Sequence, residues 1–245
     1  MAFSKIAASS LIDGIVSDRP NATPLIINSN MAVAQRGTSA SGLGASASYN
    51  TCDRWKLETE GSPSARFTQS QDTDVPTGEG FSSSLKMDCT TSATPDADDG
   101  LAITYRIESQ DLQLLKYGTS SAEKITLSFW VKATKTGTNV IWIYQNDDSR
   151  SQAQSYTVNT TNTWEKKTVV FNADTTGVID NNTGEGFRIT WWLTAGSNFT
   201  SGTLATTWQS HTSANNAVGQ VNNADNTSNN FWITGVQMEV GEYTS

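Results

Sequence analysis

The sequence has almost none of the residues that build catalytic or metal centres from imidazole and thiolate groups. It contains one histidine, His211, and two cysteines, Cys52 and Cys89, which are far apart and have no nearby Cys or His companions. A structural zinc site needs four such ligands at short spacings, and a Ser-His-Asp triad needs a nucleophile at a strained turn, yet no Gly-X-Ser-X-Gly elbow is present. We therefore expect no catalytic residues, no metal and no cofactor. Whether Cys52 and Cys89 pair is left open.

Charged residues are also scarce, and their balance is acidic. Only 16% of the residues are charged, and the formal net charge at pH 7 is -8. Binding of duplex nucleic acid requires clustered Lys and Arg, so we expect no nucleic-acid partner. No apolar run is long enough for a transmembrane helix or a signal peptide, so we expect no membrane insertion and no export signal.

Residues that favour pleated strands and turns are abundant instead. Thr, Ser, Asn and Gly are frequent, and the eight Trp stand beside few helix-forming runs. Apolar and polar residues alternate most regularly over residues 125–132 and 186–193, as in a strand with one buried face. Roughly ten such segments predict an all-β fold, an antiparallel two-sheet β-sandwich (jelly roll) with at most one or two short helices. The expected strands are 54–58, 65–69, 83–89, 101–107, 125–132, 140–144, 155–158, 164–171, 186–193 and 231–240.

Turn chemistry predicts how these strands connect. Residues 108–118 are the one short helix that we expect. The turns that follow Lys135 and Asn159 predict hairpins between the strands on either side, and residues 37–47 predict a loop rich in Gly and Ser. The long connection 194–230 contains isolated aromatic residues, which favour ordered packing in a functional segment or one held by a partner. The last strand is expected to pair near the first.

The chain divides into two unequal parts. Residues 1–24 are interpreted as an N-terminal arm or docking segment, and residues 25–245 as one jelly-roll β-sandwich domain. The apolar residues of the arm have no core of their own, so we expect the arm to dock on a partner or a neighbouring subunit; a frayed terminus is the alternative.

Acidic residues cluster at three turns. These are Asp72 to Asp74, Asp96 to Asp99, and Asp147 with Asp148. Clustered carboxylates could supply oxygen ligands to calcium, but none of the three has the full spacing of an EF-hand loop. Solvated turn residues are the favoured interpretation.

The aromatic residues are the strongest indication of a ligand-binding site in the sequence. Sugar rings stack on aromatic faces, so exposed Trp and Tyr on one face of a sandwich would suit a carbohydrate. Strand alternation places four such residues opposite the expected core: Trp130, Trp142, Tyr144 and Trp192. We predict that they form a ligand-binding platform; the alternative is that a lid loop or another subunit covers them. Trp55, Trp164 and Trp232 are expected in the core.

Both ends of the domain resemble a known family. Residues 25–55 begin Leu-Ile-Ile-Asn-Ser-Asn-Met-Ala-Val-Ala-Gln-Arg-Gly and end Tyr-Asn-Thr-Cys-Asp-Arg-Trp, and residues 233–241 read Ile-Thr-Gly-Val-Gln-Met-Glu-Val-Gly. Together with residues 129–133 and 163–171, they resemble the sandwich domain of bacteriophage tail-fibre and virion surface proteins, which is like a carbohydrate-binding module. The resemblance implies a structural virion protein, a homotrimer whose arm docks on other virion proteins and whose sandwich adheres to host surface polysaccharide.

The resemblance leaves the position on the particle open. No coiled coil or collagen-like repeat is present, which favours a compact knob or capsid decoration over a long shaft. Without an export signal, assembly in the host cytoplasm is expected. Two alternatives remain: a glycan-degrading tail enzyme, for which a longer region with β-helix repeats would be expected, and a bacterial extracellular carbohydrate-binding module, which would need an export signal.

Overall fold

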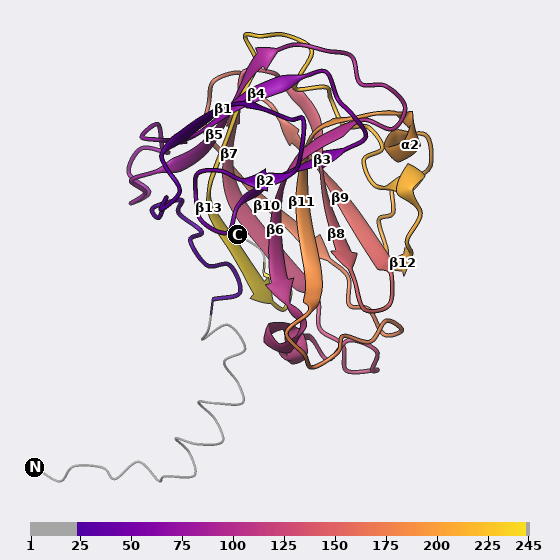
Figure 1. Cartoon of the computed structure of the whole chain (residues 1–245). Coiled ribbons are helices and arrows are strands. Elements are labelled where there is room, and N and C mark those ends of the chain that lie inside the picture. Colours follow the sequence, from indigo (N-terminus) through magenta and orange to yellow (C-terminus); the bar gives the residue numbers. More distant parts are fainter. Residues whose placement is uncertain (1–23, 244–245) are drawn as a thin grey trace, which may run out of the picture.

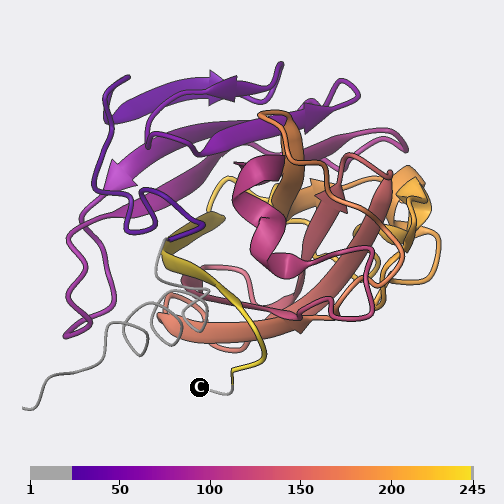
Figure 2. The ribbon, with the colours of Figure 1, turned by 90° about the horizontal axis from the view of Figure 1, so that it is seen from below.

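The computed structural model describes residues 24–243, which form two antiparallel β-sheets that face each other across the core (Figures 1 and 2). The six-stranded sheet has the order β1-β4-β5-β13-β7-β10, and the seven-stranded sheet has the order β12-β9-β8-β11-β6-β3-β2. The predicted all-β jelly-roll sandwich is therefore confirmed. The strands are β1 (Ser39–Leu43), β2 (Ser48–Tyr49), β3 (Lys56–Glu60), β4 (Arg66–Asp72), β5 (Ser84–Thr91), β6 (Gly100–Glu108), β7 (Ile125–Ala133), β8 (Gly137–Gln145), β9 (Arg150–Val158), β10 (Glu165–Phe171), β11 (Glu185–Ala195), β12 (Gln209–Ser210) and β13 (Asn230–Val240).

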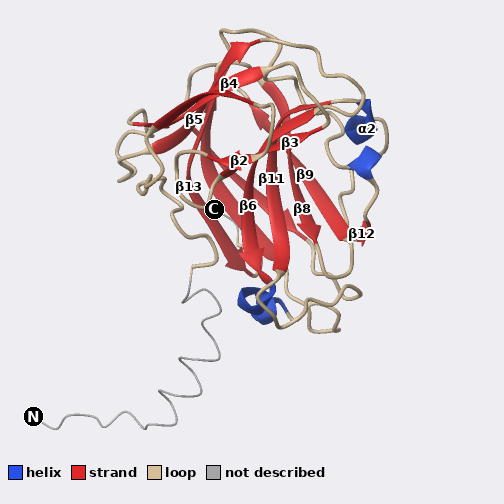
Figure 3. Cartoon of the chain, viewed as in Figure 1, coloured by secondary structure: helices blue, strands red, loops and turns tan. Residues whose placement is uncertain are grey.

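Helical structure in the described part of the chain is short and lies at the margins of the sandwich (Figure 3). It consists of the 3-10 helices η1 (Ser109–Leu115) and η2 (Ser213–Asn215) and the single-turn α2 (Ser197–Thr200). The expected helix over residues 108–118 is η1, and Lys116 ends it by taking a left-handed conformation with φ 53°. No helix within residues 24–243 combines the length and apolar character needed to cross a membrane.

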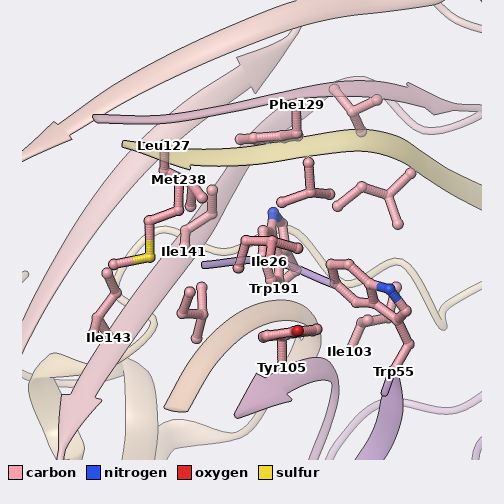
Figure 4. Close-up of a cluster of buried hydrophobic side chains, with 14 of the residues drawn as sticks. Ile26, Trp55, Ile103, Tyr105, Leu127, Phe129, Ile141, Ile143, Trp191 and Met238 are labelled. Carbon is pink, nitrogen blue, oxygen red and sulfur yellow. The ribbon is translucent and has the colours of Figure 1, made fainter. Parts of the chain in front are cut away.

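Alternate side chains of β7 and of β11 point into the core. Phe129 of β7 and Trp191 of β11 point into the space between the sheets, where their ring centroids lie 6.0 Å apart in an edge-to-face arrangement. Trp55 joins them, with its ring 5.5 Å from Trp191 and 5.1 Å from Tyr105, and Figure 4 shows these rings gathered with the surrounding aliphatic side chains. The expected burial of Trp55 is confirmed.

Two predicted hairpins are wrong. β7 and β8 belong to different sheets, and so do β9 and β10, so the turns after Lys135 and Asn159 carry the chain across the sandwich. The hairpin partner of β8 is β9, which pairs with it along its full length. Turn residues show where the chain reverses, but they do not show whether it returns to the same sheet or to the facing one.

The placement of the first and last strands also differs from expectation. β13 lies inside the six-stranded sheet between β5 and β7, whereas β1 lies at the edge and pairs only with β4. β1 itself falls within residues 37–47, which were predicted as a loop. Its sequence, Ser-Ala-Ser-Gly-Leu, has no hydrophobic alternation because an edge strand that is mostly exposed needs none.

The segment that follows the N-terminal residues is held firmly against the domain. The backbone N–H of Ile27 donates to the Tyr105 hydroxyl at 2.7 Å, and the Trp55 indole N–H donates to the carbonyl of Asn28 at 3.0 Å. Ile26 and Met31 are buried in the core. The predicted arm lies outside the described residues except for Pro24, so its docking stays a prediction.

The two cysteines form no disulfide, and one of the acidic clusters binds backbone groups of the protein itself. Cys52 and Cys89 are buried and unpaired, and burial raises the pKa of the Cys52 thiol to about 11. Asp99 accepts hydrogen bonds from the backbone N–H groups of Ser62 and Asp96. Among residues 24–243, no group of three or more His, Cys, Asp or Glu side chains is placed to hold a metal ion.

Candidate ligand-binding cleft

Residues 196–222, here called the covering segment, lie over the outer face of β8, β9 and β11 (Figure 1). Backbone hydrogen bonds fix it at both ends: Gly196 N–H donates to the carbonyl of Asp99 at 2.8 Å, and Val221 N–H donates to that of Thr138 at 2.9 Å. The segment closes a second apolar cluster, separate from the main core, that contains Ala102, Val140, Trp142, Ala153, Trp192 and Ala217. The expectation that the long connection is ordered is therefore met by packing against its own sheet.

A cleft of about 330 Å³ opens beside the covering segment on this outer face. Its floor continues into a small hollow of about 10 Å³ between the two indole rings and two glutamates of β3. The cleft is lined by Glu60, Trp142, Tyr144, Asn146, Arg188, Trp192, Phe199, His211, Ser213 and Asn216. The hollow is lined by Glu58, Glu60, Gly100, Ala102, Trp142, Arg188, Thr190 and Trp192.

The floor of the cleft is deep because two of its residues, Gly100 and Ala102, have little or no side chain. A Cβ at Gly100 would lie 2.9 Å from Cζ3 of Trp192, so only glycine allows the indole ring to lie this close to the sheet. Ala102 is the next outward-facing residue on the same strand and pairs with Trp192 across the sheet. Larger side chains at these two positions would fill the hollow.

Aromatic rings form one wall of the cleft. Trp142 and Tyr144 alternate on β8 and stack with centroids 5.4 Å apart and an interplanar angle of 22°. His211 comes from the covering segment, and its ring lies 5.1 Å from that of Tyr144. Trp192 lies 6.5 Å from Trp142 and is backed by Phe199 at 5.3 Å.

The structure brings together three of the four predicted site residues. Trp142, Tyr144 and Trp192 line the cleft, whereas Trp130 lies on β7 in the other sheet, so a single platform of all four is wrong. Trp142 and Trp192 expose only 6% and 4% of their surface because the covering segment packs on them, as the lid-loop alternative anticipated. Tyr144 is half-buried and presents more of its ring. Ligand binding by these residues stays a prediction.

Trp232 is buried, as expected, but it lies with the half-buried Trp164 on the outer face of the six-stranded sheet and not between the two sheets. The ammonium of Lys132 lies 4.5 Å from the ring centroid of Trp232 and 5.9 Å from that of Trp164. The indole of Trp164 donates to Asp74, which also pairs with Lys132, and the indole of Trp232 donates to Asp72. These contacts hold the connection after β4 against the sheet, and they occupy two of the acidic residues considered for calcium.

Several buried polar atoms that have no hydrogen-bond partner among residues 24–243 belong to residues that line the cleft. They include the indole N–H groups of Trp142 and Trp192, the hydroxyl of Thr190 and the side-chain oxygen of Asn216. Buried polar groups in proteins are nearly always hydrogen-bonded, and each one left without a partner costs about 1–3 kcal/mol. All four atoms belong to residues that line the cleft or the hollow in its floor.

Charged groups near the floor are paired, with one exception. Arg106 bridges Glu58 at 3.0 Å and Glu185 at 2.7 Å, and Arg188 also pairs with Glu185 at 3.0 Å. Glu58 is held in addition by Lys56 at 3.0 Å. The carboxylate of Glu60 makes no ion pair or hydrogen bond with any residue that the structure describes.

The pKa values of two cleft residues are shifted by their surroundings. Burial raises the pKa of Glu60, and the neighbouring charge of Glu58 raises it further, while Arg188 and Lys56 act in the opposite direction. Burial also lowers the pKa of His211, and the charge of Arg188 adds to this effect. The Nε2 atom of His211 lies 3.1 Å from the side-chain nitrogen of Asn216. A neutral His211 is therefore favoured near pH 7.

Sequence reasoning missed several residues of the cleft. Glu60, Arg188 and Thr190 could have been found, because they occupy the outward positions of strands whose alternation is clear. Phe199 and Asn216 lie in a segment without periodicity, so the sequence carries no signal that would place them there.

No family model and no curated protein matches this chain. Among solved structures, it is similar to the enzymatically active domain of tailspike protein 4 of bacteriophage CBA120, with 16% identity, a TM-score of 0.41 and coverage of 77% of this chain but only 19% of that one. It is also similar to a family 11 carbohydrate-binding module from Clostridium thermocellum in complex with a mixed-linked tetrasaccharide, with 10% identity, a TM-score of 0.42 and coverage of 85% and 99% of the two chains. A putative sugar binding protein from Bacteroides thetaiotaomicron has 12% identity, a TM-score of 0.44 and coverage of 89% and 100%. Similarities this distant assign neither activity nor ligand.

Proposed function

We propose that this protein binds a polysaccharide in the cleft on the outer face of the seven-stranded sheet, as a non-enzymatic component of a bacteriophage particle. The observation that carries the binding proposal is the wall of Trp142, Tyr144 and His211 in a cleft whose lining residues carry N–H and O–H groups without a partner in the described part of the chain. A pyranose ring offers an apolar C–H face for the rings and hydroxyl groups for the polar atoms. The cleft matches both requirements.

The virion role rests on different observations. The opening and closing sequences at residues 25–55 and 233–241 resemble those of phage fibre and virion surface proteins, and the residues between them fold as one sandwich. A single cleft is expected to bind a glycan weakly, but several copies on one particle add avidity without new contacts. We therefore infer a homotrimer that docks on other virion proteins through residues 1–24 and contributes to adhesion to the host surface, as part of a tail fibre, tail or capsid decoration.

Replacing Tyr144 with alanine is expected to weaken polysaccharide binding at least tenfold, because the ring supplies the more accessible part of the aromatic wall. Native affinity electrophoresis against surface polysaccharides purified from candidate bacterial hosts measures the loss. Trp130→Ala is the matched control, since Trp130 is an aromatic residue on the other sheet. Equal loss of binding in both variants, or none in Tyr144→Ala, would remove the cleft as the site. Release of reducing ends from the polymer would favour the tail-enzyme alternative instead.

The assembly proposal predicts a mass in solution of three chains for the full-length protein and a monomer mass after deletion of residues 1–23. Multi-angle light scattering on both forms measures this, and immunogold labelling of intact particles tests the location. A full-length monomer that is absent from purified particles would contradict the virion role while leaving the glycan proposal standing.

A further inference from the structure

A second open space, here called the arginine pocket, has a volume of about 470 Å³ and is larger than the cleft. The two spaces share no lining residue. The charged residues that line the pocket are three arginines and three acids, so it offers hydrogen-bond donors and acceptors together. This mixture suits a ligand with many hydroxyl groups better than a phosphate polymer, which is bound by clustered Lys and Arg. These six residues are Arg36, Arg54, Arg106, Asp53, Glu108 and Glu185.

The arginine pocket and the cleft lie on the same face of the seven-stranded sheet. Arg188 of the cleft is directly across from Arg106 of the pocket on one side and from Tyr144 on the other. All three point outward, because their neighbours along each strand belong to the core. Glu185 binds Arg106 at 2.7 Å and Arg188 at 3.0 Å, so one ion-pair network joins the two spaces.

Tyr49 lies at the far side of this face. It belongs to the edge strand β2 and is directly across from Lys56, whose neighbour Leu57 is in the core, so Tyr49 also points outward. The order β8-β11-β6-β3-β2 places four strand spacings, roughly 19 Å across the strands, between the backbones of Tyr144 and Tyr49. Tyr49 is 40% exposed, with the Arg36 guanidinium 5.6 Å from its ring centroid. Each space is thus lined by an accessible aromatic ring that can stack on a sugar.

Several polar groups in these two spaces have no partner in the described part of the chain. The guanidinium of Arg54 lies 5.8 Å from the ring centroid of Tyr105 but makes no hydrogen bond or ion pair. Arg188 uses only its Nε atom in its ion pair, so its two terminal nitrogens have no partner. Glu108 accepts one hydrogen bond, from the side chain of Gln110 at 2.9 Å, and forms no ion pair. Guanidinium groups donate to hydroxyl oxygens and carboxylates accept from hydroxyl groups, so these side chains match the polar edge of a sugar.

The backbone of Arg54 has an unusual conformation. Its φ is 74°, in the left-handed region that residues other than Gly, Asn and Asp rarely adopt. If only the turn mattered, Gly or Asn would suit this position better. An arginine at this position is consistent with a role for its side chain.

From this arrangement we propose that the arginine pocket is a second subsite for the polysaccharide bound in the cleft. The chain crosses the strands of the sheet from Tyr144 to Tyr49, with one sugar ring against Tyr49 and hydroxyl groups on Arg54 and Glu108. The inference rests on the proposed glycan binding and extends its site. The ligand is then a chain of several sugars and not a single terminal sugar.

The dependence of binding on chain length tests this second subsite. The probes are surface polysaccharides purified from candidate bacterial hosts, each used intact and after partial acid hydrolysis and separation by size. Affinity electrophoresis identifies the intact polymer that binds, and isothermal titration calorimetry measures its size fractions. We expect the affinity to rise at least tenfold from the shortest fraction that binds to fractions long enough to reach both tyrosines.

Two variants with matched controls assign this gain to the pocket. Tyr49→Ala should weaken binding of the long fractions at least fivefold and leave the shortest binding fraction unchanged. Arg54→Asn should do the same at least threefold, because Asn tolerates the left-handed backbone but lacks the guanidinium. Tyr243→Ala removes a tyrosine that is 45% exposed, and Lys116→Asn removes a positive charge from another left-handed position, with φ 53°. Neither control residue lines the pocket or the cleft, so neither variant should change any affinity.

The outcomes separate the second subsite from glycan binding itself. Affinity that does not depend on chain length would overturn the subsite, and so would a loss in Tyr49→Ala that is absent, equal for short and long fractions, or matched by the controls. Loss of binding in Tyr144→Ala would still leave the cleft as a glycan site. Failure of every host polysaccharide to bind the unaltered protein would overturn the proposed function and the subsite with it. Circular dichroism confirms that all variants are folded.

Discussion

Alanine in place of Trp192 is expected to lower the free energy of unfolding by about 3–5 kcal/mol, the usual cost of deleting a large buried aromatic side chain. Trp192 is 4% exposed, and its ring fills the space between Gly100 on the sheet and Phe199 of the covering segment. Its loss would leave a cavity that the backbone hydrogen bonds of the segment prevent from closing. Urea denaturation followed by circular dichroism measures the change.

Trp130→Ala is the control for this measurement. Trp130 is half-buried on the outer face of the other sheet, so its removal opens no enclosed cavity and should cost much less. A loss below about 1 kcal/mol for Trp192→Ala would mean that the covering segment does not pack on the ring. Because Trp192 supports the fold, loss of binding in this variant alone could not identify a contact with ligand, which is why Tyr144 carries the functional test.

Alternation along the strands was sufficient to predict the class of fold and which side chains face inward. Ile125, Leu127, Phe129 and Val131 all lie in the core, as their spacing of two residues requires. The same pattern on β8 and β11 placed Trp142, Tyr144 and Trp192 on outward faces, and pairing with Thr190 on β11 brings Trp142 beside Trp192. Local residue order was enough for these inferences because one face of each strand must be buried.

The assignment of strands to sheets could not be predicted in the same way. β7 and β8 have similar alternation and a turn between them, yet they belong to different sheets instead of pairing. The energy that decides between these arrangements comes from contacts distant in sequence, such as Phe129 with Trp191. For this reason Trp130 was grouped with residues on the opposite side of the molecule.

The burial of Trp142 and Trp192 depends on the covering segment, whose sequence shows no periodic spacing of apolar residues. Its position is fixed by individual backbone bonds to the sheet, such as that from Ala153 N–H of β9 to the carbonyl of Ala205 at 2.7 Å. Composition indicated order in this segment but not the surface that it covers. The depth of the cleft, which depends on Gly100 and Ala102, became visible only once β6 was known to lie beside β11.

Removal of the Asp174 carboxylate is expected to cost about 3–5 kcal/mol of stability, because it would leave the charge of Arg150 buried without a partner. Asp174 binds the guanidinium through both oxygens, at 2.6 and 3.1 Å, and the two side chains are only 2% and 15% exposed. Arg150 also donates to the carbonyl of Trp208 at 3.3 Å, so the pair connects β9 to the covering segment. Chemical denaturation of Asp174→Ala measures the effect.

The exposed pair Lys116–Glu123 provides the control for this prediction. Its side chains are 53% and 42% exposed, so Glu123→Ala should cost at most about 1 kcal/mol. Adding Arg150→Met to Asp174→Ala should recover part of the loss, since the uncompensated charge is then gone. A double variant that is less stable than Asp174→Ala would show that Arg150 stabilises the protein mainly through its packing and its bond to Trp208. The cost of Asp174→Ala would then come from lost hydrogen bonds, including the one that Asp174 accepts from Thr176 N–H at 3.0 Å, rather than from an isolated charge.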